Sequence, residues 1–212
     1  MADVQDATTR KDRRRGRRRD EILAVAAAKF TSQGYEATTL EQIADELELA
    51  KASLYYYVSN KEELLLRIAI RHTQEIAGAG MSAAGETGEA HERLWRLIAA
   101  HVEAACLQPH TELLDVNSRI LRRRAEDGPG VELREIIGAY DRFVLSLVEE
   151  GVARGTFAAE PQTASPMIMA AANAMARWSV SQRVVSAADR GVSAAQLIVG
   201  GLMSPMLRPP PS

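Results

Sequence analysis

Three kinds of residue are scarce in this chain of 212 residues: cysteine, lysine and the aromatics. The single cysteine, Cys106, excludes an internal disulfide framework and any metal site built from four cysteines, and it is compatible with a reducing compartment. Aromatic residues make up 5% of the chain. Runs of Val, Ile, Thr and Tyr that would suggest strands are also few, which favours helices. We expect an all-α fold of about nine helices.

Long apolar runs are missing as well. The longest uncharged stretch, residues 191–207, contains glycine and proline, so we expect no transmembrane helix and no membrane partner. The apolar residues 22–28 follow an arginine-rich segment as in a signal peptide, but Asp20 and Glu21 interrupt the pattern and Lys29 ends it. This arrangement favours an amphipathic helix in a cytoplasmic protein, with secretion as the alternative.

Positive charge is concentrated near the N-terminus. Residues 10–20 hold eight basic and two acidic side chains, a net charge of +6, whereas residues 21–80 carry a net charge of −4. So dense a block of like charge predicts a flexible basic arm over residues 1–16. Such arms contact phosphates or enter a minor groove, and the alternative is a solubilising tail without a target. We expect the basic segment to neutralise phosphates of bound DNA, with Arg17, Arg18 and Arg19 among its contacts.

A helix-turn-helix pattern occupies about residues 39–58. Thr39 and Gln42 have the spacing of a capping box, which predicts the start of a short helix. A break at Glu48 separates this helix from the next, expected at about residues 50–57. In a helix-turn-helix, the second helix of the pair lies in the major groove of DNA.

The side chains of that second helix suit a groove. Lys51 and Ser53 are polar, and Ala52 is small enough to allow close approach. Tyr55 and Tyr56 can reach phosphate oxygens or thymine methyl groups. The other predicted DNA contacts lie at or just before helix starts, where free N–H groups attract phosphate; these residues are Thr38, Thr39 and Lys61.

Four short motifs follow one another in the first third of the chain. They are Gly-Tyr-Glu-Ala-Thr-Thr at residues 34–39, Ile-Ala at 43–44, Ser-Leu-Tyr-Tyr-Tyr-Val at 53–58 and Ser-Asn-Lys-Glu-Glu-Leu-Leu at 59–65. In order and spacing they resemble the tetracycline-repressor (TetR) family of bacterial regulators over about residues 17–70. Two positions depart from the family pattern, Glu48 in place of Gly and Val58 in place of Phe. A left-handed backbone at Glu48 would cost on the order of 1 kcal/mol.

The resemblance implies a homodimer with two functional parts. A Gly-rich stretch at residues 77–90 predicts a loop or domain junction. We therefore expect a DNA-binding domain over residues 17–77, a helical ligand-binding and dimerisation domain over 78–207, and a Pro-rich tail over 208–212.

Two expected helices near the C-terminus are more apolar than one buried face requires. In the TetR family the corresponding helices pair across a two-fold axis to form a four-helix bundle. The predicted interface residues are Met167, Ala171, Met175 and Trp178 on one helix and Leu197, Ile198, Gly201 and Leu202 on the other.

The predicted ligand pocket is lined by helices of the C-terminal part. Its mostly apolar candidates predict a mostly apolar ligand with one or two polar contacts, although a place in the packed core is the alternative for several of them. The region around residues 176–178 is faintly similar to family members that sense acyl-CoA thioesters. The candidates are Trp95, Ile98, His101, Val102, Leu114, Asn117, Ile120, Tyr140, Phe143 and Asn173.

The expected function is that of a ligand-responsive repressor, a homodimer that binds a palindromic operator and is released by its ligand. An enzyme would need a nucleophile with a base or a carboxylate pair, and no such motif is present, so we expect no catalytic residue, cofactor or metal. The alternative is a helical protein–protein adaptor without DNA binding. That alternative would leave the register of Lys51, Tyr55 and Lys61 unexplained.

Overall fold

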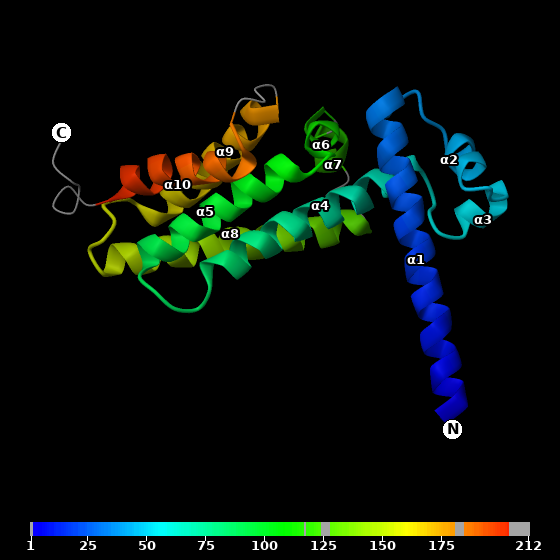
Figure 1. The fold of residues 1–212 in the computed structure, drawn as a ribbon, viewed down its shortest axis with the longest axis horizontal. Helices are drawn as coiled ribbons and strands as arrows, with labels where there is room; N and C mark the ends of the chain where they lie inside the picture. The colour runs from blue at the N-terminus through cyan, green and yellow to red at the C-terminus, as the bar shows by residue number, and fades with distance from the viewer. Residues whose placement is uncertain (1, 117, 124–127, 181–184, 204–212) are drawn as a thin grey trace. The chain divides into compact units, whose positions relative to one another are not determined.

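The computed structural model describes residues 2–116, 118–123, 128–180 and 185–203 (Figure 1). Within these ranges the chain is helical, apart from turns and one isolated bridge between Phe157 and Met203, which confirms the all-α prediction. Ten helical segments stand where about nine were expected, because α6 and α7 flank residue 117, which lies outside the described ranges. The helices are α1 (Ala2–Gln33), α2 (Leu40–Glu46), α3 (Lys51–Tyr55), α4 (Lys61–Ala84), α5 (Ala90–Leu107), α6 (Thr111–Val116), α7 (Ser118–Arg123), α8 (Pro129–Ala153), α9 (Pro161–Val180) and α10 (Ala187–Leu202).

The chain divides into two compact units. Unit 1 comprises residues 1–70 and 113–130, and unit 2 comprises residues 71–112 and 131–212. Unit 1 thus holds α1, α2, α3 and the beginning of α4, together with α6 and α7. Its core is apolar and fully buried, because one stripe of each helix faces inward at helical spacing. The largest of these buried side chains are Ile22, Phe30, Ile43, Leu54, Leu64 and Leu65.

Helix α1 is longer than the sequence suggests. The expected helix covers about residues 18–32, yet α1 begins at Ala2, so the segment expected to be a flexible arm continues the helix. Arginine is a good helix former, and the exposed surface of a helix lets its charges point away from one another. Residues 13–17 are exposed, and burial begins at Ile22.

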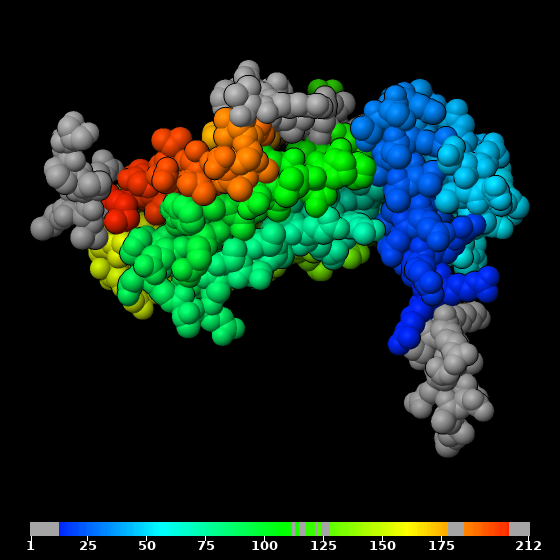
Figure 2. Space-filling model, in the orientation of Figure 1, coloured from blue at the N-terminus to red at the C-terminus, as the bar shows by residue number. Residues whose placement is uncertain are grey.

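Unit 2 is a bundle of α5, α8, α9 and α10 with the later turns of α4. Its core contains Leu94, Leu97, Val144 and Leu147, all fully buried. Helix α10 packs along α5, and Figure 2 shows it lying on the surface of that helix.

The contact between α10 and α5 depends on Gly191. A Cβ atom at this position would overlap the backbone carbonyl oxygen of Ala99 on α5. We expect Gly191→Ala to lower the free energy of unfolding by about 1–3 kcal/mol, because a backbone atom cannot move aside without separating the helices. Gly78→Ala on α4 is the matched control, since nothing lies near its Cβ, and it should stabilise by up to about 1 kcal/mol. Urea unfolding of both variants tests this, and equal effects would contradict it.

The structure corrects the Gly-rich loop expected at residues 77–90. Helix α4 continues to Ala84 and leaves only residues 85–89 as the connection to α5. Gly80 lies within α4, and glycine is required there because the Tyr140 hydroxyl occupies the space that a Cβ would need. That requirement comes from tertiary packing, which the glycine content of a sequence does not reveal.

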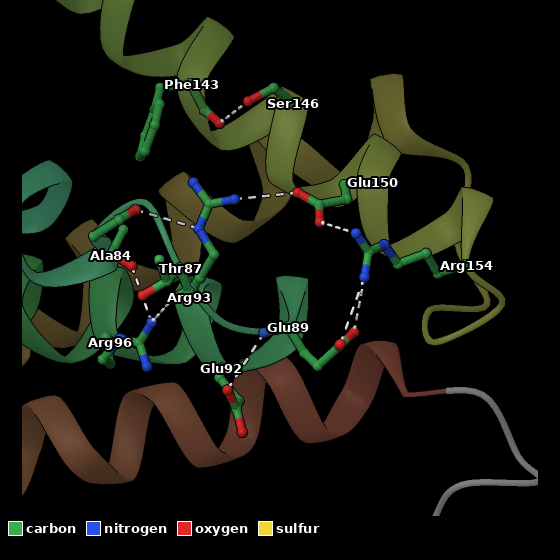
Figure 3. A network of polar contacts seen from close by, with 11 residues as sticks. Ala84, Thr87, Glu89, Glu92, Arg93, Arg96, Phe143, Ser146, Glu150 and Arg154 are labelled. Atoms are coloured by element: carbon green, nitrogen blue, oxygen red, sulfur yellow. Dashed lines mark hydrogen bonds and ion pairs between the residues drawn. The ribbon is translucent and has the colours of Figure 1, made fainter.

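Two arginines of α5 and Arg154, the residue directly after α8, hold the short α4–α5 connection (Figure 3). Arg96 donates to the carbonyl oxygens of Ala84 and Thr87, each at 3.0 Å. Arg93 donates to Glu150 at 3.2 Å, and Arg154 pairs with Glu89 at 3.3 Å. The guanidinium groups thus satisfy carbonyls at the end of α4 that have no partner within the helix.

None of the described helices combines the length and the apolar character that crossing a membrane demands.

Candidate nucleic-acid interface

Local hydrogen bonds define the helix-turn-helix. The Thr39 hydroxyl accepts from the Gln42 N–H at 3.3 Å, and the Gln42 side chain accepts from the Thr39 N–H at 2.8 Å, which confirms the predicted capping box. After α2 the chain turns at Glu48, whose φ of 52° is left-handed. Glu48 therefore occupies the conformation that glycine adopts most easily, at a cost on the order of 1 kcal/mol.

Helix α3 presents one polar and aromatic face. Leu54 is fully buried and anchors the helix, whereas Tyr55 and Tyr56 are 45% and 65% exposed. Tyr57, in the turn that follows α3, is less exposed than either. We call the exposed set the α3 face, defined as Lys51, Ala52, Ser53, Tyr55 and Tyr56.

Cations lie close to both exposed tyrosines of the α3 face. The guanidinium carbon of Arg15 on α1 lies 5.2 Å from the centre of the Tyr56 ring, and the Lys51 ammonium lies 5.9 Å from that of Tyr55. Arg18 donates to the Leu47 carbonyl oxygen at 3.3 Å, at the end of α2. Helix α1 therefore brings two arginines to the helix-turn-helix.

Two residues predicted to contact DNA have structural tasks. The side chain of Thr38 is only 1% exposed, and its hydroxyl donates to the Gly34 carbonyl oxygen at 2.9 Å. Its side chain is therefore not available to DNA. The Lys61 ammonium donates to the carbonyl oxygens of Tyr35 and Glu36 at 2.7 and 3.1 Å and lies 4.4 Å from the Tyr35 ring centre. Lys61 thus holds the turn after α1, and a phosphate would have to compete with these partners.

Arg17 and Thr39 are exposed, and Arg18 and Arg19 are half-buried. The sequence placed Arg15 in a flexible basic arm and gave no role to Glu41. In the structure Glu41 forms an ion pair with Lys51. Only the folded arrangement of α2 and α3 brings this pair together.

Three predicted ligand contacts in unit 2 form a polar chain from the buried Tyr140 and His101 to the exposed Asn173. His101 on α5 lies 3.2 Å from the Tyr140 hydroxyl through Nδ1 and 3.2 Å from the Asn173 amide oxygen through Nε2. Because an amide oxygen only accepts, Nε2 carries the hydrogen and Nδ1 accepts from Tyr140. Burial lowers the pKa of His101 to about 4, so the ring is neutral at neutral pH. Burial also raises the pKa of the Tyr140 hydroxyl.

The other ligand candidates are spread over both units. In unit 2, Ile98 and Val102 are buried in the core, and Trp95 and Phe143 pack against it. In unit 1, Leu114 is buried and Ile120 lines a cleft of about 510 Å³. Asn117 lies outside the described residues. The cleft is also lined by Tyr35, Glu36, Asn60, Lys61, Glu62 and Arg123.

The predicted interface residues are unevenly exposed. Leu197 on α10 is 71% exposed, and Met167 on α9 is also well exposed. Gly201 is exposed, while Ala171 is half-buried. The side chain of Trp178 lies outside the described part of the chain. The remaining three, Met175, Ile198 and Leu202, are partly buried against the core of unit 2.

Comparison with known proteins identifies the architecture. A family model described as bacterial regulatory proteins, tetR family, matches residues 22–68. The HTH-type transcriptional repressor KstR2 of Mycolicibacterium smegmatis is 28% identical over 141 residues, which are 66% of this chain and 67% of that protein. The chain thus matches this curated relative over about two thirds of its length.

Solved structures share the fold over most of their length. The ketosteroid transcriptional regulator KstR2 of Mycobacterium tuberculosis superposes with a TM-score of 0.71 and 22% identity, over 88% of this chain and 95% of that one. A tetR-family regulatory protein from Rhodococcus RHA1 gives a TM-score of 0.76 and 21% identity, over 87% of this chain and 96% of that one. With the capped helix-turn-helix and the exposed α3 face, these matches show that residues 22–68 form a helix-turn-helix domain of the tetR family of bacterial regulatory proteins and that the chain shares the fold of the solved regulators.

Proposed function

We propose that the protein is a ligand-responsive repressor that binds a palindromic operator as a homodimer. The observation that carries the proposal is the α3 face, which exposes lysine, serine and two tyrosines around one buried leucine. A helix of this kind can enter the major groove while its buried side holds it to the module. The adaptor alternative offers no reason for cations to border that face.

DNA binding and ligand binding belong to different parts of the chain, with the bounds that the sequence predicts. Residues 17–77 bind DNA, and residues 78–207 bind the ligand and dimerise through α9 and α10. A two-fold axis presents two α3 faces, so the operator is palindromic with half-sites about one helical turn apart or a multiple of it. The curated relative KstR2 is named a repressor, which supports repression over activation. A protein that binds an operator shares the compartment of the DNA, which supports a cytoplasmic location.

The effector is a mostly apolar small molecule with one or two polar atoms. Its polar contacts come from the buried His101 and Tyr140 and from Asn173 at the surface of unit 2. One solved relative is named a ketosteroid regulator, and a steroid fits this description, as does the acyl part of an acyl-CoA thioester. Mass spectrometry of small molecules retained by the purified protein would identify the class.

The basic N-terminal part of α1 supplies the phosphate contacts that a net acidic module lacks. We expect deletion of residues 1–16 to weaken binding to the upstream DNA of the protein's own gene. The deletion removes five basic side chains, Arg10, Lys11, Arg13, Arg14 and Arg15. The slope of log K against log salt should become shallower by about 1 for each phosphate that the truncated protein no longer neutralises.

Fluorescence anisotropy at several salt concentrations measures this slope. The buried face of α1 begins after the deletion, at Ile22, so the truncated module should keep its helical circular dichroism. A folded truncated protein with an unchanged salt slope would refute the role of residues 1–16 in phosphate binding. A wild type that binds no DNA would refute the proposed function.

A further inference from the structure

The Lys51 charge on the α3 face is held by a neighbouring carboxylate. Glu41, in the first turn of α2, forms an ion pair with Lys51, the first residue of α3. The two side chains are 49% and 56% exposed. The hydrogen bond from Lys51 lowers the pKa of Glu41, and the same contact raises the pKa of Lys51. Both groups are therefore charged around neutral pH, and the pair is intact in the DNA-free protein.

This position matters because it faces the surface that meets DNA. The Lys51 ammonium also lies 5.9 Å from the ring centre of Tyr55, so pair and ring belong to one exposed patch. A carboxylate there repels phosphate and competes with it for the only lysine of the α3 face. Because exposed ion pairs are weak, DNA can still separate the two side chains.

The competition between Glu41 and phosphate has different effects on binding to random DNA and on binding to an operator. Binding to random DNA depends almost entirely on phosphate contacts, so the repulsion by Glu41 is not offset. Binding to an operator adds contacts to base edges, which form only in the correct register. In that register the base contacts supply the affinity and Lys51 can keep its pair with Glu41, so the cost of separating the pair falls on random DNA.

We propose that Glu41 is a specificity-determining residue, which weakens binding to non-operator DNA by pairing with Lys51 and repelling phosphate. The inference rests on the proposed DNA-binding function of the α3 face. It assigns to Glu41 a role in discrimination and not in the affinity for the operator itself.

The test compares Glu41→Gln with the wild type on a duplex of random sequence and on the protein's own upstream DNA. Glutamine keeps the size of the side chain and removes its charge. We expect affinity for the random duplex to rise roughly threefold to tenfold, and the salt slope to steepen by about 1 for each subunit. Affinity for the upstream DNA should change by less than about twofold, so the specificity ratio falls.

Glu46→Gln is the matched control, since it removes the same charge from the same helix. Glu46 pairs with Lys29 at 3.2 Å and does not contact Lys51. A second control is Glu41→Gln in a Lys51→Gln background, where the increase in affinity should largely disappear because the pair no longer exists. Thermal unfolding of each variant verifies that the module remains folded.

The results distinguish a failure of the role of Glu41 from a failure of the proposed DNA-binding function. If Glu41→Gln binds the random duplex like the wild type, or no better than Glu46→Gln does, the role of Glu41 is overturned while DNA binding stands. The same holds if affinity for both duplexes rises equally, since discrimination is then unchanged. If the wild type binds neither duplex, the proposed function fails, and this inference with it.

Discussion

A Leu197→Glu protein should be monomeric at concentrations where the wild type is a dimer. Leu197 on α10 is 71% exposed in the single chain, and Met167 on α9, the helix that packs against α10, is also well exposed. In the proposed two-fold interface each leucine becomes buried, and symmetry brings two copies into the contact. A glutamate would place two unpaired carboxylates there, at a cost of about 4 kcal/mol or more, which is at least about a thousandfold in the dissociation constant.

Light scattering of the purified proteins measures the change directly. Ile137→Glu is the control, because Ile137 is an exposed apolar residue on α8, outside the proposed interface. In solution the Ile137→Glu protein should have the molar mass of a dimer, as the wild type does. Leu197→Glu should also bind operator DNA far more weakly, since a monomer offers one α3 face. A Leu197→Glu protein that remains dimeric would show that α10 is not at the interface.

The second large effect concerns pH and His101. The unfolded chain titrates this group near its ordinary pKa of 6.5, whereas burial lowers the pKa of the folded state to about 4. Between these values the unfolded state binds the proton more strongly, so stability is present above pH 6.5 and is lost as the pH falls to about 4. The difference of 2.5 pKa units corresponds to about 3 kcal/mol.

His101→Gln should remove this part of the acid sensitivity. Glutamine can still hydrogen bond to Tyr140 or Asn173 but does not titrate. The variant will be less stable at neutral pH because glutamine packs less well than the ring, so the readout is the change in free energy of unfolding between pH 7 and pH 4. Urea unfolding at several pH values should show a decrease that is smaller by about 3 kcal/mol than in the wild type. Parallel curves would mean that His101 is not the group responsible.

The parts of the fold that the sequence predicted correctly depend on local chemistry. The capping box of Thr39 and Gln42 involves residues three positions apart, and the exposed α3 face follows from one buried leucine in a short helix. Even the left-handed Glu48 could be anticipated, because the family pattern has glycine at that position.

The parts that the sequence did not predict depend on contacts between distant segments. Lys61 was expected at phosphate, but its partners Tyr35 and Glu36 lie 26 and 25 residues away. Gly80 within α4 makes room for the Tyr140 hydroxyl of α8, 60 residues further along the chain. The pairing of Glu41 with Lys51 requires the angle at which α2 meets α3. Neither periodicity nor propensity carries this information.

Hydroxyl-radical footprinting of the wild-type protein on the upstream DNA of its own gene tests the central claim most directly. If two α3 faces enter major grooves of one duplex, two protected patches should appear on the same side of the DNA, with centres about 34–36 Å apart or a multiple of that distance. A single patch, patches on opposite sides of the duplex, or uniform protection at saturating protein would contradict the account.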